Sequence, residues 1–174
     1  INKFVKPGKN VLTLKIYRWS TGSYLECQDF WRISGIERDV FLYSQPKAAL
    51  KDFRVTSTLD DTYKDGIFKL GVDLRNNGST AGNMTLVYEL LDANGKVVAT
   101  GEKATNVAAG ETRTVSFDQT LPDVKTWTSE APNLYKLVMT VKENGKVNEI
   151  IPFNVGFRRI EIKPTEQLAR NGKP

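Results

Sequence analysis

The segment from Tyr17 to Val40 holds the residues best suited to chemistry in this chain of 174 residues. It interleaves aromatic and charged side chains with little apolar periodicity, unlike a segment that only fills a core. The carboxylate of Asp29 could accept short charge-assisted hydrogen bonds and offer hard oxygen ligands to a cation. The residue types alone leave a plainer alternative open, in which Asp29 is a loop aspartate paired with Arg32 or Arg18.

Two features of the composition restrict the chemistry. The chain contains no histidine, which excludes a His-ligated metal site and a Ser-His-Asp triad within it. Cys27 is the only cysteine, so no internal disulfide can form, and no histidine is available to activate it as a nucleophile. Trp19 and Tyr24 could stack on a sugar ring, but packing in a core or an interface is the commoner role for such rings.

Four motifs carry a resemblance to a known family. The run R-W-S-T-G-S-Y-L-E-C-Q-D-F-W-R-I-S-G-I-E-R-D-V, residues 18–40, resembles the end of the sugar-binding domain in family 2 glycoside hydrolases, the β-galactosidases above all. In that family the run joins a jelly-roll domain to an immunoglobulin-like domain. W-T-S-E-A-P-N-L-Y (127–135), V-G-F-R-R-I-E-I (155–162) and N-G-K-P (171–174) follow in the family's order. Between residues 47 and 126 the resemblance depends on strand spacing alone.

The resemblance implies roles for single residues. Asp29 matches the family's aspartate that reaches into the catalytic barrel, binds galactose hydroxyls and ligates a sodium ion; magnesium is a further possible cofactor of the whole enzyme. Trp31 would pack beneath the loop, and Arg32 or Arg38 would hold a carboxylate such as Glu26 or Asp39. The family often has aspartate where this chain has Thr21 and Cys27, which puts the fine sugar specificity in doubt.

The resemblance also implies where the catalytic residues lie. Retaining glycosidases need two carboxylates about 5–5.5 Å apart, one as acid/base and one as nucleophile. In the family both belong to the barrel that follows N-G-K-P, so we expect no catalytic residue in this chain and no activity of the chain alone. The implied partners are a β-galactoside substrate and the enzyme's own catalytic barrel.

The overall composition fits an ordinary globular protein, with 40% hydrophobic and 26% charged residues. No apolar run approaches the ~20 residues of a membrane helix, and the first residues lack the apolar core of a signal peptide. Because the chain does not begin with Met, we expect its native N-terminus to be missing, so the sequence is compatible with either the cytoplasm or the periplasm. The net charge of +5 is concentrated in residues 1–46 and 159–174 without a Lys/Arg run, so it does not indicate nucleic-acid binding.

Residues 1–46 are predicted to be the C-terminal part of a sugar-binding jelly roll. Alternating apolar residues predict a half-buried strand over residues 10–18. A second strand, over 39–44, should end before Pro46, which has no N–H for a ladder, and the domain boundary is placed there. So short a segment cannot form a core of this kind alone, and we expect its apolar side chains to lack cover.

Residues 47–158 are predicted to form an immunoglobulin-like β-sandwich, because short β-rich runs separated by turn residues recur through them. The seven runs cover residues 50–58, 68–75, 84–91, 96–104, 112–119, 134–142 and 147–155. Asn94-Gly95 and Asn144-Gly145 are hairpin signals. Along 68–75 the alternation turns Phe68, Leu70, Val72 and Leu74 inward. Trp127 and Tyr135 are expected to close the sandwich, and no segment predicts a long helix.

Residues 159–174 are predicted to be a polar linker to the catalytic barrel, poorly ordered in isolation. The sequence as a whole therefore predicts an all-β, non-catalytic part of a retaining β-galactosidase. Its sandwich would be a structural spacer, and its Asp29 loop would complete the active site. Two alternatives remain: β-glucuronidase or β-mannosidase specificity on the same scaffold, and a stand-alone carbohydrate-binding or adhesion module of immunoglobulin type.

Overall fold

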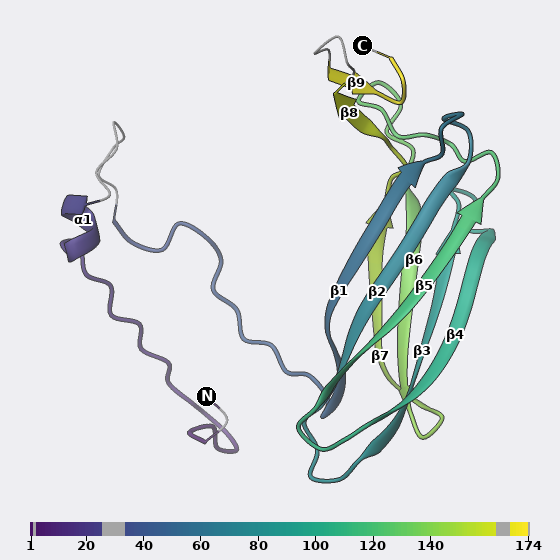
Figure 1. Ribbon diagram of the computed structural model, residues 1–174. Coiled ribbons are helices and arrows are strands. Elements are labelled where there is room, and N and C mark those ends of the chain that lie inside the picture. The colour runs from purple at the N-terminus through teal and green to yellow at the C-terminus, as the bar shows by residue number, and fades with distance from the viewer. Residues whose placement is uncertain (2, 26–33, 163–167, 174) are drawn as a thin grey trace. The chain divides into compact units, whose positions relative to one another are not determined.

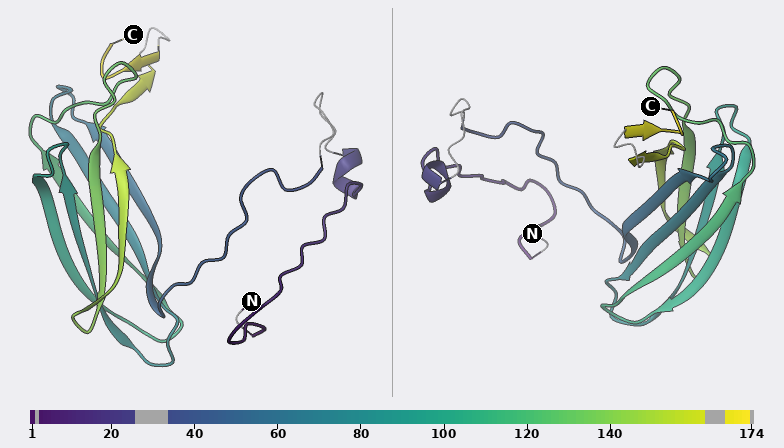
Figure 2. Two further views of the ribbon diagram at one scale, coloured as in Figure 1. Left: turned by 180° about the vertical axis from the view of Figure 1, so that it is seen from behind. Right: turned by 45° about the horizontal axis from the view of Figure 1, so that its top comes forward.

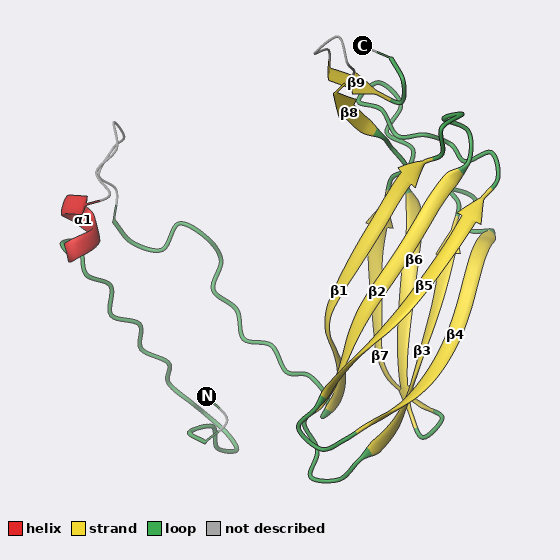
Figure 3. Cartoon of the chain, viewed as in Figure 1, coloured by secondary structure: helices red, strands yellow, loops and turns green. Residues whose placement is uncertain are grey.

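The computed structural model describes residues 1, 3–25, 34–162 and 168–173. The chain divides into two compact units, Ile1–Tyr43 and Ser44–Pro174. Within the described residues, the first unit contains one short helix, α1 (Thr21–Leu25), and the second contains all of the strands. Figure 3 shows this division between helix and strand.

The second unit is an antiparallel β-sandwich, which confirms the predicted fold class (Figure 1). One sheet has the order β1-β2-β5 and the other has the order β4-β3-β6-β7. The strands are β1 (Ala48–Leu59), β2 (Gly66–Asn76), β3 (Gly82–Leu91), β4 (Val97–Val107), β5 (Thr112–Leu121), β6 (Tyr135–Glu143) and β7 (Lys146–Val155). These seven strands correspond one to one to the seven runs predicted from the alternation of apolar residues.

Alternate residues of both sheets point into one core. Four side chains of β2 are at most 1% exposed, as the alternation predicted: Phe68, Leu70, Val72 and Leu74. From the opposite sheet, the ring of Tyr88 on β3 lies 5.5 Å from that of Phe68 and 4.8 Å from that of Phe117 on β5. Burying such rings stabilises the sandwich, by about 1.5–3 kcal/mol for one large apolar side chain.

Both predicted hairpins are present. Asn144 and Gly145, between β6 and β7, have φ values of 49° and 81°, which fits the left-handed pair of a two-residue turn whose twist matches the flanking strands. The β3–β4 turn is held by Asp92, whose carboxylate oxygen Oδ1 accepts hydrogen bonds from the backbone N–H groups of Asn94 at 2.8 Å and Lys96 at 3.0 Å. Local turn chemistry therefore fixes the register of two strand pairs.

The first unit differs from the prediction. The structure assigns no strand to residues 10–18 or 39–44, so both predicted strands are wrong for these described residues. A strand exists only with a hydrogen-bonding neighbour, and alternation along one segment cannot supply one. The apolar side chains that suggested the first strand are half exposed or more: Val11 83%, Leu12 53%, Leu14 53% and Ile16 50%. The expectation that they lack cover agrees with these values.

The C-terminal segment is more structured than predicted. Residues 160–170 contain two short strands, β8 (Ile160–Ile162) and β9 (Leu168–Arg170), which pair antiparallel. Figure 2 shows this two-stranded ribbon beside one end of the sandwich. Ala169 on β9 is fully buried. The prediction of a poorly ordered linker is therefore wrong for the described residues of this segment, because long-range contacts order it.

Candidate functional site

The site residues predicted from the sequence, Asp29, Trp31 and Arg32, lie outside the described residues, as does Cys27. The residues just before them are described. Trp19 and Tyr24 have ring centres 6.5 Å apart and are 53% and 75% exposed, so neither is a core residue here. In the sequence, these two accessible aromatic residues precede the predicted substrate-binding loop.

The end of the sandwich next to the ribbon is closed by two aromatic residues, as predicted. The Trp127 backbone N–H donates to the Phe157 carbonyl at 2.8 Å, and the ring of Trp127 packs over Gly156. A Cβ atom at position 156 would lie 3.1 Å from the Trp127 side chain, so glycine allows this close approach. Tyr135 is buried, and its ring meets that of Phe157 edge-on at 5.3 Å.

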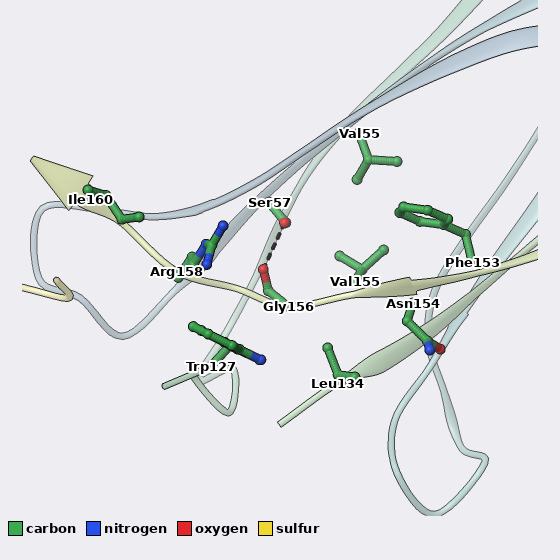
Figure 4. Close-up of a pocket in the computed structure, with 10 residues that line it drawn as sticks. All are labelled: Val55, Ser57, Trp127, Leu134, Phe153, Asn154, Val155, Gly156, Arg158 and Ile160. Carbon is green, nitrogen blue, oxygen red and sulfur yellow. Dashed lines mark hydrogen bonds between the residues drawn. The ribbon is translucent and has the colours of Figure 1, made fainter. Parts of the chain in front are cut away.

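A shallow cleft of about 450 Å³ lies beside Trp127, between β1, β7 and the start of the ribbon (Figure 4). Its lining is about equally polar and apolar, and the Arg158 guanidinium lies 5.0 Å from the centre of the Trp127 ring system. The Ser57 hydroxyl donates to the Gly156 carbonyl at 2.9 Å and ties β1 to the residue that follows β7. None of the described residues lining this cleft is acidic, so it offers no carboxylate for catalysis.

A charged cluster joins the ribbon to the loop between β1 and β2, and no sequence pattern predicted it. Arg159 Nη1 lies 2.7 Å from Asp61 Oδ1, and Arg159 Nε lies 3.1 Å from Glu161 Oε2. The Tyr63 hydroxyl donates to Glu161 Oε1. Tyr63 and Glu161 are separated by 98 positions in the chain, and no local pattern links residues so far apart.

The carboxyl groups with shifted pKa values at this end of the sandwich are shifted downward. A hydrogen bond from the Thr62 hydroxyl lowers the pKa of Asp60 to about 2. The pKa of Glu130 is lowered to about 2, mainly by a hydrogen bond from the Ser129 hydroxyl. A general acid near neutral pH needs the opposite shift, so both groups are suited to accepting hydrogen bonds as anions.

Neither a metal centre nor a membrane span is found in the described part of the chain. No three His, Cys, Asp or Glu residues gather there in a way that could hold a metal ion. Among the same residues, no helix has the length and apolar character needed to cross a membrane.

Two family models match the chain. The model for glycosyl hydrolases family 2 matches residues 48–158, and the model for the sugar-binding domain of the same family matches residues 1–46. The chain therefore belongs to glycosyl hydrolase family 2, and the resemblance drawn from the four motifs is confirmed.

Curated relatives are β-galactosidases. The chain is 40% identical to one from Priestia megaterium over 175 residues, which cover 99% of this chain and 17% of that protein. It is also 40% identical to one from Halalkalibacterium halodurans over 174 residues, covering 99% of this chain and 16% of that protein. The chain thus spans less than a fifth of the length of these relatives.

Solved structures support the fold. A β-glucuronidase from Bacteroides uniformis superposes with a TM-score of 0.77 at 21% identity, covering 85% of this chain and 19% of that one. A family 2 glycosyl hydrolase from Bacteroides cellulosilyticus superposes with a TM-score of 0.67 at 21% identity, covering 74% and 18%. At this level of identity the likeness concerns the fold and not the sugar that is bound.

Proposed function

We propose that this chain is the part of a retaining β-galactosidase that precedes and supports its catalytic domain. The sandwich of residues 47–158 acts as a structural spacer, and the segment of residues 1–46 carries a loop that completes the active site. The catalytic carboxylates belong to the barrel of the same enzyme, so the chain alone does not hydrolyse glycosides. The substrate of the whole enzyme is a terminal β-galactoside.

The observation that carries this proposal is the 40% identity to β-galactosidases over 99% of the chain. The identity extends to both ends of the chain, and family models match the sugar-binding segment as well as the sandwich. The similarity is therefore not limited to a shared sandwich fold. The cluster of carboxyl groups at Asp60, Asp61 and Glu161 also fits a structural role, because each is engaged by hydrogen bonds or by Arg159. The β-glucuronidase likeness concerns the fold alone and does not favour that specificity.

Asp29 is the residue we propose to contact the galactoside. A carboxylate accepts charge-assisted hydrogen bonds from sugar hydroxyls, and its hard oxygen atoms suit a sodium ion. Trp31 and Arg32 would support its loop. We propose that the other sodium ligands, and those of any magnesium ion, come from other parts of the enzyme. One carboxylate alone is a partial site, which fits a loop that completes a pocket in another domain.

Two measurements test the proposal. The purified chain should release no chromophore from an aryl β-galactoside above background, and turnover that disappears when one of its own carboxylates is mutated would contradict the assignment. In the full-length enzyme, Asp29→Ala should lower kcat/KM at least tenfold, because a lost charge-assisted hydrogen bond costs about 1.5–3 kcal/mol. Its dependence on sodium should weaken as well. A normal kcat/KM with a normal sodium response would remove Asp29 from the site.

A further inference from the structure

The loop between β1 and β2 has an unusual conformation at Tyr63. The φ angle of Tyr63 is 58°, in the left-handed region that side chains other than glycine rarely adopt. The loop is shaped by Asp60, whose Oδ1 accepts hydrogen bonds from the backbone N–H groups of Lys64 and Asp65, each at 3.0 Å. A strained aromatic residue persists only where surrounding contacts determine its position. Its contacts therefore point to a specific role.

Those contacts go to the start of the ribbon. The Tyr63 hydroxyl donates to Glu161, and the Arg159 guanidinium lies 5.5 Å from the centre of the Tyr63 ring. Arg159 bridges Asp61 and Glu161 and also donates to the Asp60 carbonyl at 3.2 Å. The Arg159 and Glu161 side chains are only 29% and 24% exposed, so solvent screens their interaction less than it screens a fully exposed pair.

The residues that follow β9 contact Arg159 and Tyr63 as well. Asn171 donates its backbone N–H to the Arg159 carbonyl at 2.8 Å, and its Oδ1 accepts the Arg159 backbone N–H at 2.8 Å. Gly172 has a φ of 76°, and a Cβ atom there would lie 2.7 Å from the Tyr63 ring. The Asn-Gly pair of the N-G-K-P motif therefore packs directly against Arg159 and Tyr63.

We propose that Arg159 is a positioning residue. Together with Tyr63 and Glu161 it fastens the β8–β9 ribbon to the β1–β2 loop, so that residues 171–173 leave the sandwich in one direction. The consequence for catalysis rests on the proposed function: in the β-galactosidase, this fastening sets the orientation of the sandwich relative to the catalytic domain.

Amide hydrogen exchange on this chain tests the fastening. In Arg159→Ala, the amides of the ribbon and of Asn171 should exchange roughly tenfold faster or more, since two charge-assisted contacts are lost. Exchange in the core of β2, β3 and β6 should stay within about twofold, because local opening of the ribbon is separate from global unfolding. The matched control is Lys69→Ala, which breaks an exposed 3.0 Å ion pair with Asp118 on the sandwich.

Milder variants guard against a general loss of folding. Tyr63→Phe removes one hydroxyl, and Glu161→Gln removes one charge while keeping the side-chain shape; each should speed ribbon exchange by a smaller factor. Arg159→Lys should restore protection only in part, because an ammonium group cannot bridge two carboxylates with the planar fork of a guanidinium. Unchanged ribbon exchange in Arg159→Ala with a folded core, or full rescue by lysine, would overturn the proposal.

Kinetics of the full-length enzyme test the consequence. Arg159→Ala should raise KM for an aryl β-galactoside roughly tenfold through a changed orientation of the sandwich relative to the catalytic domain, with kcat changed far less. Lys69→Ala should change neither constant. A loosened ribbon with an unchanged KM would overturn the link to substrate binding. Absence of β-galactoside hydrolysis by the wild-type full-length enzyme would overturn the proposed function. The exchange experiment would still test whether Arg159 fastens the ribbon to the β1–β2 loop.

Discussion

Replacing Tyr88 by phenylalanine should make the sandwich more stable. Tyr88 is completely buried on β3, and its hydroxyl has no hydrogen-bond partner among the described residues. Burial also raises the pKa of this hydroxyl, as expected for a group whose charged form has lost its solvent. The substitution keeps the ring, and with it the contacts to Phe68 and Phe117.

The magnitude follows from two opposing terms. An unpaired buried hydroxyl costs about 1–3 kcal/mol in proteins, and phenylalanine removes that cost. The space left by one oxygen atom costs about 0.3 kcal/mol at the usual penalty for cavity volume. We therefore expect Tyr88→Phe to raise the free energy of unfolding by about 1–2 kcal/mol.

Urea unfolding followed by circular dichroism measures this effect. The midpoint for Tyr88→Phe should rise by roughly 0.5–1 M with an unchanged slope. Tyr135→Phe is the matched control, because the Tyr135 hydroxyl accepts a hydrogen bond from the Lys125 backbone N–H at 2.9 Å. That variant should lose about 0.5–1.5 kcal/mol.

The comparison of the two variants can refute the reasoning. If Tyr88→Phe is destabilised as much as Tyr135→Phe, the Tyr88 hydroxyl must have a partner, such as an ordered water molecule, and the argument from an unpaired group fails. A midpoint equal to that of the wild-type chain would mean that the cavity and desolvation terms cancel, and the expected magnitude would be wrong.

Three further predictions concern other parts of the sandwich. Gly101→Ala should destabilise it by about 1–3 kcal/mol in the same urea assay, because the added Cβ would lie 2.7 Å from the Tyr88 ring; full wild-type stability would contradict this. The pKa of Asp60, about 2 when folded against 3.8 ordinarily, means that its stabilisation is present above pH 3.8 and is lost as pH falls towards 2. In thermal melts, the difference in Tm between the wild-type chain and Asp60→Asn should therefore become smaller as pH falls through that range. A difference in Tm that stays constant would contradict this prediction. The hydrogen bond to Glu161 raises the pKa of Tyr63, so its stabilisation is present below the ordinary pKa of 10.0 and lost as pH rises through the folded value. Ribbon exchange corrected for its intrinsic pH dependence should accelerate there, and should not do so in Tyr63→Phe.

The positions of the sandwich strands along the chain could be predicted from the sequence because the information is local. A period of two places every second residue of β2 on one face, and burial of that face fixes its direction. Asn144-Gly145 adopts the left-handed backbone that a tight hairpin requires, whatever the rest of the chain does. The family motifs likewise lie in short continuous runs, and the family assignment drawn from them is confirmed.

The same local information led to wrong predictions where the formation of a strand depends on pairing with another segment. The alternation at residues 10–18 predicts a strand, yet alternation only says which face could be buried, and a strand also needs a neighbour for its backbone groups. The segment of residues 159–174 failed in the opposite way. Its polar composition suggested a linker, but β8 and β9 pair with each other and are held by contacts from the sandwich.

What the sequence by itself determined is the set of sandwich strands, two of their turns and the family, since each depends on residue types within a few positions of one another. The role of Asp29 stays a prediction. Only the tertiary structure decided that Tyr63 meets Glu161, that Arg159 bridges two carboxylates, and that the Tyr88 hydroxyl is buried without a partner among the described residues. These features depend on side chains about a hundred positions apart, or on the packing of two sheets. Such distances are set by the folded chain as a whole and leave no periodic signal in the sequence.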